Sequence, residues 1–219
     1  MPRLIPISSA QALAEKADAI VVSVEYRKGP EFKFSTAHND AFAAYVWTLK
    51  NASTFKGDST RTAVAGESAG GNLAINVSIM ARNSGIRKPV HQLAVYPVAS
   101  NDPNTPSKIQ YVNAKPLGTP PLPWFLMHYL NSMAESADPR ISLVNANLSG
   151  LPKTTIIAAE IDPLLSEGKI LADKLQAANV SVTYKLYIGV THEFFGMASV
   201  IPEARDAQDL AAKELKKSF

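Results

Sequence analysis

The chain has 219 residues, of which 22 are basic and 19 are acidic, so its net charge is only +3. The basic residues are scattered, which gives little support for nucleic-acid binding, and the lack of cysteine excludes disulfides and thiolate metal sites. Because 46% of the residues are hydrophobic, the chain can bury a sizeable core, and its length predicts a single domain over residues 1–219.

Apolar residues are not gathered into long runs. No stretch reaches the length of about 18 apolar residues that a membrane-spanning helix needs, so we expect no membrane span. The first ten residues lack the apolar core of a signal peptide, which favours a cytoplasmic location.

Predicted strands alternate with predicted helices along the chain. The strands expected from β-branched and apolar composition are Ile20–Glu25, Thr62–Ala65, Gln92–Tyr96, Thr155–Ala159 and Val182–Tyr187. The helices expected from apolar spacing are Ser9–Ala17, Thr36–Lys50, Ala69–Arg82, Pro123–Met133, Leu164–Ala178 and Pro202–Lys217. This alternation predicts an α/β fold with a mostly parallel sheet of about five strands flanked by helices.

Prolines gather in one stretch after the third predicted strand. Residues 101–123 contain six prolines and little periodicity, and an aromatic run begins at Trp124. A long insertion of this kind suggests a lid or pocket wall over about residues 101–135. The aromatic helix either packs on the core or lines a substrate pocket, and the sequence leaves both readings open.

The segment Gly66-Glu67-Ser68-Ala69-Gly70 has the pattern G-x-S-x-G. It lies between a predicted strand and a predicted helix, where this pattern places a serine on a sharp turn with its hydroxyl exposed. The flanking glycines suit a place where strand and helix backbones pass too close for side chains. The other reading is a glycine-rich loop without catalytic function.

Asp162 follows the fourth predicted strand and precedes Pro163. Acids at the carboxyl ends of parallel strands lie on the face where α/β enzymes place their chemistry. The alternative is that Asp162 only caps the next helix.

His192 lies in the loop after the last predicted strand. A lone loop histidine is commonly a solvated surface residue, but the chain order Ser68, Asp162, His192 is the order of the catalytic residues in α/β-hydrolases. Together the three positions predict a catalytic triad.

Four segments resemble the hormone-sensitive-lipase-like family of bacterial carboxylesterases. They are Val21–Arg27 with Pro30-Glu31, then Gly66–Asn72, Asp162–Leu164 and His192–Gly196. The resemblance extends from about Ala19 to the end of the chain. It implies an α/β-hydrolase fold and a serine esterase that acts on small-molecule carboxylic esters, without a metal or organic cofactor.

The resemblance also assigns roles to residues. It implies Ser68 as the nucleophile, His192 as general base and acid, and Asp162 as the carboxylate that orients the imidazole. It implies the N–H of Ala69 as an oxyanion donor. Gly66, Glu67, Gly70 and Gly71 would build the turn around the nucleophile.

One motif of the family is missing from this sequence. Family members carry a His-Gly-Gly oxyanion loop, whereas the only adjacent glycines here are Gly70 and Gly71. The N-terminal cap and first strands of the family also have no counterpart, so the chain resembles an N-terminally truncated member. We therefore expect weak activity, with a degenerate binding protein or inactive truncated homologue as the alternative. An uncovered strand at Ile20–Glu25 would favour a homo-oligomer.

Overall fold

The computed structural model describes residues 7–219. Its centre is a parallel sheet in which β1 (Val64–Glu67), β2 (His91–Val95), β3 (Lys153–Ile161) and β4 (Val182–Thr191) lie side by side in chain order. Ala65 aligns with Leu93, Leu93 with Thr155, and Thr155 with Thr183. The carboxyl ends of all four strands therefore lie at one edge of the sheet, which is where such folds hold their functional groups.

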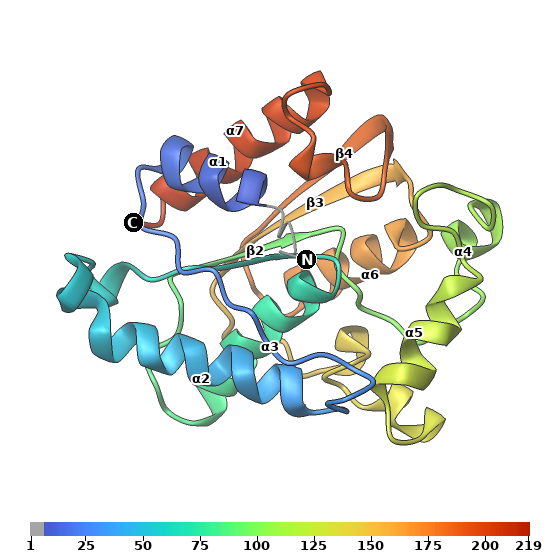
Figure 1. Ribbon diagram of the computed structural model, residues 1–219, viewed down its shortest axis with the longest axis horizontal. Coiled ribbons are helices and arrows are strands. Elements are labelled where there is room, and N and C mark those ends of the chain that lie inside the picture. Colours follow the sequence, from blue (N-terminus) through green and yellow to red (C-terminus); the bar gives the residue numbers. More distant parts are fainter. Residues whose placement is uncertain (1–6) are drawn as a thin grey trace.

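Helices cover both faces of this sheet. The helices of the described residues are α1 (Ile7–Ala17), α2 (Thr36–Asn51), α3 (Ala69–Asn83), α4 (Pro106–Gln110), α5 (Pro121–Tyr129), α6 (Leu165–Ala177) and α7 (Pro202–Lys216). Short 3₁₀ turns occur at Ala52–Phe55, Ser59–Arg61, Met133–Ala137, Leu143–Asn145 and Phe194–Gly196. Figure 1 shows α1 and α7 together on one face of the sheet, α3 and α6 on the other, and α2 against α3.

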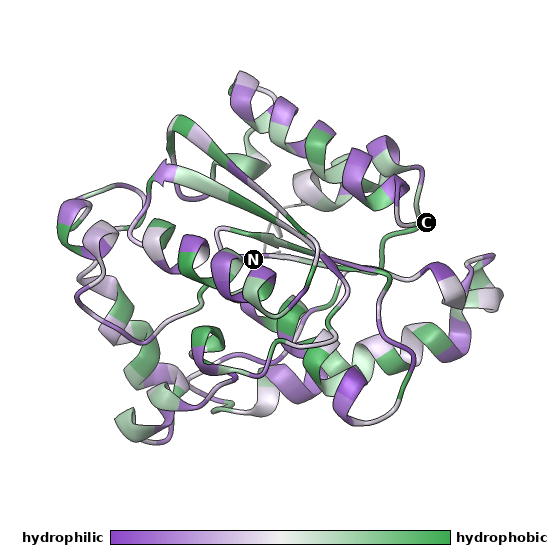
Figure 2. Ribbon diagram, turned by 180° about the vertical axis from the view of Figure 1, so that it is seen from behind, coloured by the Kyte–Doolittle hydropathy of each residue, from purple (hydrophilic) through white to green (hydrophobic). Residues whose placement is uncertain are grey.

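The alternation of side chains along the strands divides the core into two layers. Leu93 and Val95 of β2 point into a cluster beneath α1 and α7, whereas Ala94 between them joins a second cluster. That second cluster includes Ile75 of α3 and Leu171 of α6. In Figure 2 the central strands are largely coloured hydrophobic, between helices of mixed colour. Burial of β2 and β3 on both faces explains their apolar runs, Leu93–Val95 and Ile156–Ala159.

The predicted strand Ile20–Glu25 is wrong. Residues 19–28 have no regular secondary structure, and Ile20, Val21 and Val22 are 55%, 40% and 39% exposed. A strand exists only through hydrogen bonds to a neighbouring strand, and within residues 7–219 β1, which could be that neighbour, pairs only with β2. In this part of the chain the sheet therefore has four strands rather than about five, with β1 at one edge.

The other predicted elements are present with shifted ends. β1 starts two residues later than predicted, and β3 and β4 extend beyond the predicted ranges. The segment 101–135 contains α4, α5 and the start of a 3₁₀ turn, and no residue of α5 is buried. Among residues 7–219, no helix is long and apolar enough to cross a membrane.

One buried histidine makes the stability of this fold depend on pH. His91 begins β2 and is 2% exposed, with its Nδ1 3.1 Å from the Ser218 hydroxyl and its Nε2 3.0 Å from the Thr155 hydroxyl. Burial lowers the pKa of His91 from 6.5 to about 4. The neutral imidazole is thus favoured in the folded state, while the unfolded chain takes up a proton first as the pH falls.

We therefore expect the contribution of His91 to be fully present above pH 6.5 and lost as the pH falls towards 4. The loss should amount to about 2–3 kcal/mol of unfolding free energy. Urea unfolding at pH 7 and pH 4 measures it, and His91→Gln should remove this part of the acid sensitivity. His128→Gln, at a half-buried position in α5, is the control. Equal acid sensitivity in the wild type and His91→Gln would contradict the prediction.

Candidate active site

Ser68 occupies a strained turn between β1 and α3. Its backbone has φ 55° and ψ −118°, a region that residues with a side chain rarely adopt. The Ser68 N–H donates to the Val95 carbonyl at 2.9 Å, and the Ser68 carbonyl accepts from the N–H groups of Asn72 and Val98, each at 3.2 Å. Hydrogen bonds to β2, to the loop after it and to α3 therefore hold the strained residue in place.

The glycines around Ser68 differ in how much room the structure leaves for a side chain. A Cβ on Gly66 would lie 2.1 Å from the Gly70 carbonyl oxygen, so no larger residue fits there. A Cβ on Gly71 would lie 3.0 Å from the Cβ of Pro97, which is also tight. A Cβ on Gly70, by contrast, would meet no atom within 4 Å. The expectation that both glycines flanking the motif prevent a clash is thus right for Gly66 and wrong for Gly70, whose backbone is the obstacle.

Three side chains from the carboxyl edge of the sheet form one line of hydrogen bonds. The Nδ1 of His192 lies 2.7 Å from Oδ2 of Asp162, and the Nε2 lies 3.0 Å from the Ser68 hydroxyl. Asp162 is completely buried and His192 is 2% exposed. The structure thus brings Ser68, Asp162 and His192 together, and His192 is not a solvated surface residue.

Asp162 also partly fits the alternative reading of the sequence, in which it caps the next helix. Its second oxygen, Oδ1, accepts the N–H of Leu164 at 2.8 Å, just before α6 begins at Leu165. One carboxylate therefore both stabilises the turn and faces the imidazole. Because two hydrogen bonds use its two oxygens, the orientation of the carboxylate is fixed.

Ala69 is the first residue of α3. The first N–H groups of a helix have no acceptor within the helix, and the helix dipole favours negative charge at this end. The N–H of Ala69 is therefore free of intrahelical bonding at the residue next to Ser68.

Glu67 and Glu193 place two further carboxylates near this line. Glu67, directly before the serine, accepts a hydrogen bond of 2.5 Å from the Tyr96 hydroxyl. Oε1 of Glu193, whose side chain is 55% exposed, lies 3.9 Å from Nε2 of His192. Sequence reasoning gave Glu67 a place in the turn but found no role for Tyr96. The sequence signal for Tyr96 was an aromatic residue at the end of a predicted strand.

The turn that carries Asp162 is attached to α4. The Ser107 hydroxyl donates to the Pro163 carbonyl at 2.7 Å, and Lys108 lies 2.6 Å from Glu167 of α6. Glu167 also accepts the N–H of Ala99 at 2.7 Å. Burial raises the pKa of Glu167, while Lys108 and the Ala99 N–H oppose that shift. These contacts tie the start of the proline-rich segment to the loop after β2 and to the Asp162 turn.

A second polar cluster lies under the first turns of α3. The Asn72 side chain donates to the Val98 and Ile141 carbonyls at 3.0 and 3.1 Å. Its oxygen accepts from Asn76 at 2.9 Å and lies 3.2 Å from Nε2 of His38. Burial lowers the pKa of His38, so the neutral ring is favoured there. Sequence reasoning missed this support, which fixes α3 behind Ser68.

Within residues 7–219, the predicted site residues belong to no metal-binding cluster and do not line the surface hollow between α1 and α7. Within the described residues, no group of three or more histidines and acids is arranged to hold a metal ion. A hollow of about 500 Å³ lies between α1 and α7 and is lined by Lys16, Asp209, Ala212, Lys213, Lys216 and Lys217. It contains none of the predicted site residues.

Comparison with known proteins places this chain in a family. The α/β hydrolase fold family matches residues 7–196. Carboxylesterase NlhH of Mycobacterium tuberculosis is 36% identical over 218 residues, which are 98% of this chain and 68% of that protein. Ethyl acetate hydrolase of Pseudomonas putida is 34% identical over 206 residues, 93% of this chain and 65% of that protein. This chain thus spans about two thirds of the length of these relatives.

Solved structures agree. The crystal structure of EstE1, a thermostable carboxylesterase cloned from a metagenomic library, has a TM-score of 0.91 and 38% sequence identity, covering 94% of this chain and 71% of its own. An esterase of Pyrobaculum calidifontis has a TM-score of 0.92 at 35% identity, with 95% and 70% covered. The predicted fold and enzyme class, a carboxylic ester hydrolase, are confirmed. The chain therefore belongs to the hormone-sensitive-lipase-like carboxylesterases of the α/β-hydrolase fold family.

Proposed function

We propose that this chain hydrolyses carboxylic esters with short acyl groups through an acyl-enzyme on Ser68. The observation that carries the proposal is the line of hydrogen bonds from Asp162 through His192 to the Ser68 hydroxyl, at 2.7 and 3.0 Å. The preference for short acyl groups draws on one relative that is named an ethyl acetate hydrolase.

The proposed reaction has two halves, formation and hydrolysis of the acyl-enzyme, and the same residues act in both. His192 takes the proton of the Ser68 hydroxyl as its oxygen attacks the ester carbonyl, and then gives that proton to the departing alcohol. Asp162 holds the Nδ1 proton, so that Nε2 is the basic nitrogen, and stabilises the imidazolium that forms. Water then attacks the acyl-enzyme with His192 taking its proton, and His192 returns that proton to the Ser68 oxygen as the acyl–Ser68 bond breaks and the carboxylic acid leaves. The N–H of Ala69 stabilises the oxyanion, together with the positive end of α3.

The proline-rich segment supplies a surface for the substrate in this proposal. Trp124, Phe125 and Met127 of α5 are each at least half exposed, which is unusual for large apolar side chains gathered on one short helix. We propose that residues 101–135 act as a lid or pocket wall that covers the apolar part of the ester.

Replacing the nucleophile tests the assignment. Ser68→Ala should lower the hydrolysis of a nitrophenyl acetate by at least about 10⁴-fold, because the variant cannot form the acyl-enzyme. It should also prevent covalent labelling by an organophosphonate, which mass spectrometry would detect on the Ser68 peptide. Ser84→Ala, an exposed serine after α3, is the control and should leave both unchanged. Wild-type turnover in Ser68→Ala would refute the proposed role.

Glu193 should influence which esters are accepted. Its carboxylate lies 3.9 Å from the nitrogen that faces Ser68, so a negatively charged substrate is repelled at the reacting centre. We expect Glu193→Gln to raise kcat/KM for an ester with a carboxylate by about two- to five-fold relative to a neutral ester of similar shape, since an exposed charge is screened. Glu15→Gln, on the exposed side of α1, is the control. An unchanged ratio would exclude this influence.

We further propose that the chain forms a homo-oligomer through the segment Ile20–Glu25 and the free edge of β1. Exposed apolar side chains and an unpaired strand edge together favour pairing with a second chain, and Val24 is 40% exposed like its neighbours.

Light scattering across a dilution series should therefore give a mass above that of one chain. Val22→Lys should shift the equilibrium towards the monomer, because a charge on this surface opposes burial. Ile188→Lys introduces the same charge at a residue of β4 that is 64% exposed, and it is the control. A wild-type monomer at every concentration would contradict the proposal.

A further inference from the structure

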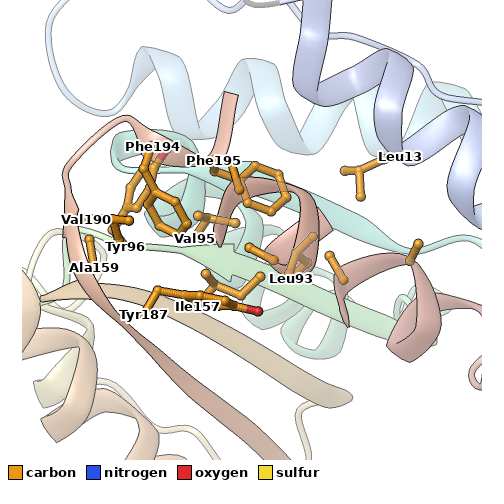
Figure 3. Close-up of a cluster of buried hydrophobic side chains, with 14 of the residues drawn as sticks. Leu13, Leu93, Val95, Tyr96, Ile157, Ala159, Tyr187, Val190, Phe194 and Phe195 are labelled. Carbon is orange, nitrogen blue, oxygen red and sulfur yellow. The ribbon is translucent and has the colours of Figure 1, made fainter. Parts of the chain in front are cut away.

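Tyr96 lies at the end of β2, against the imidazole of His192. The centres of the two rings are 4.4 Å apart at an angle of 47°, and Tyr96 is 2% exposed. Its backbone has φ 34°, and its N–H donates to the Ile157 carbonyl at 2.7 Å. Figure 3 shows Tyr96 beside Phe194 at one end of the buried cluster, and these two rings meet edge to face at 6.0 Å.

Tyr96 connects two loops. Its hydroxyl donates to Oε2 of Glu67, the residue before Ser68, at 2.5 Å, while its ring packs against His192 and against Phe194 in the turn that follows. Burial, followed by the charge of Glu67, raises the pKa of Tyr96 far above its usual value. The hydroxyl therefore keeps its proton around neutral pH, where it is a donor to Glu67.

The contact with the ring of His192 completes its orientation. Hydrogen bonds at Nδ1 and Nε2 fix the direction of the imidazole within its own plane, but they resist tilting of that plane only weakly. The ring of Tyr96, packed against the imidazole at 4.4 Å between ring centres, resists this tilt. A purely structural side chain at this place would need only the ring, because a phenylalanine fills the same volume without a polar atom to satisfy.

We propose that Tyr96 is a positioning residue for His192, which it holds at hydrogen-bond distance from Ser68 by joining the nucleophile turn to the loop of the base. This inference rests on the proposed function, because it concerns how His192 transfers protons. Small displacements of a general base or acid matter in this way, since proton transfer requires the two heavy atoms to be within hydrogen-bond reach.

The leaving group of the ester reports on this role. An alkyl ester needs His192 to protonate the departing alkoxide, whereas nitrophenolate leaves with little help. Tyr96→Phe keeps the ring and removes the link between the loops. We expect it to lower kcat/KM, which reports on acylation and so on the departure of the leaving group, by about 10- to 100-fold for an alkyl ester and by less than about tenfold for the nitrophenyl ester of the same acid.

The chain offers a matched control and a second variant. Tyr187 also donates from its hydroxyl to a carboxylate, Asp206, at 2.7 Å and is 5% exposed in the same cluster, so Tyr187→Phe removes an equivalent bond away from His192. Glu67→Ala removes the acceptor of the Tyr96 hydroxyl and should reproduce Tyr96→Phe. Adding Tyr96→Phe to Glu67→Ala should cost little more, because both changes break the same link.

The outcomes separate the two proposals. A larger loss for the alkyl ester in Tyr96→Phe, absent in Tyr187→Phe, supports the inference. Equal losses for both esters in Tyr96→Phe, in a variant whose thermal unfolding shows an intact fold, would overturn the inference alone. If the wild type lacks hydrolysis and organophosphonate labelling that depend on Ser68, the proposed function fails and the inference fails with it.

Discussion

The close approach of strand and helix around Ser68 is the constraint on which the site depends. A Cβ on Gly66 would lie 2.1 Å from the carbonyl of Gly70, so the turn can form only with glycine at position 66. The same turn forces Ser68 to a φ of 55°, a strain of the order of 1–3 kcal/mol. Surrounding structure must supply that energy, and hydrogen bonds to Val95, Asn72 and Val98 do so.

Buried polar groups then hold the elements that meet at this turn. On one side, the Asn72 carboxamide and the His38 ring bind α3 to the loops that follow β2 and precede β3. On the other, Lys108 and Glu167 join α4 to α6 beside the Asp162 turn. Buried charges cost desolvation energy, so such a pair adds little stability. Its effect is to restrict the geometry, because either charge without its partner would be strongly unfavourable.

The immediate surroundings of His192 are acidic, although the chain as a whole carries a net charge of +3. Asp162 contacts one ring nitrogen, and the exposed Glu193 lies 3.9 Å from the other. Glu67 binds the Tyr96 hydroxyl, and the ring of Tyr96 packs against His192. The three carboxylates thus differ in burial and in their partners: Asp162 is buried against the imidazole, Glu193 is exposed beside it, and Glu67 holds Tyr96.

Local patterns in the sequence determined the strands from β1 to β4, the helices between them and the chain order of Ser68, Asp162 and His192, because side-chain periodicity and turn residues act over a few positions. Only the tertiary structure decided what depends on distant neighbours. Ile20–Glu25 has the composition of a strand but forms none, since no strand of the described part of the chain lies beside it to supply hydrogen bonds. A side chain at position 70 would meet no atom, whereas a side chain at position 66 would clash with the backbone of Gly70. Tyr96 meets His192 across 96 positions of sequence, and a contact at that separation exists only once the sheet has formed.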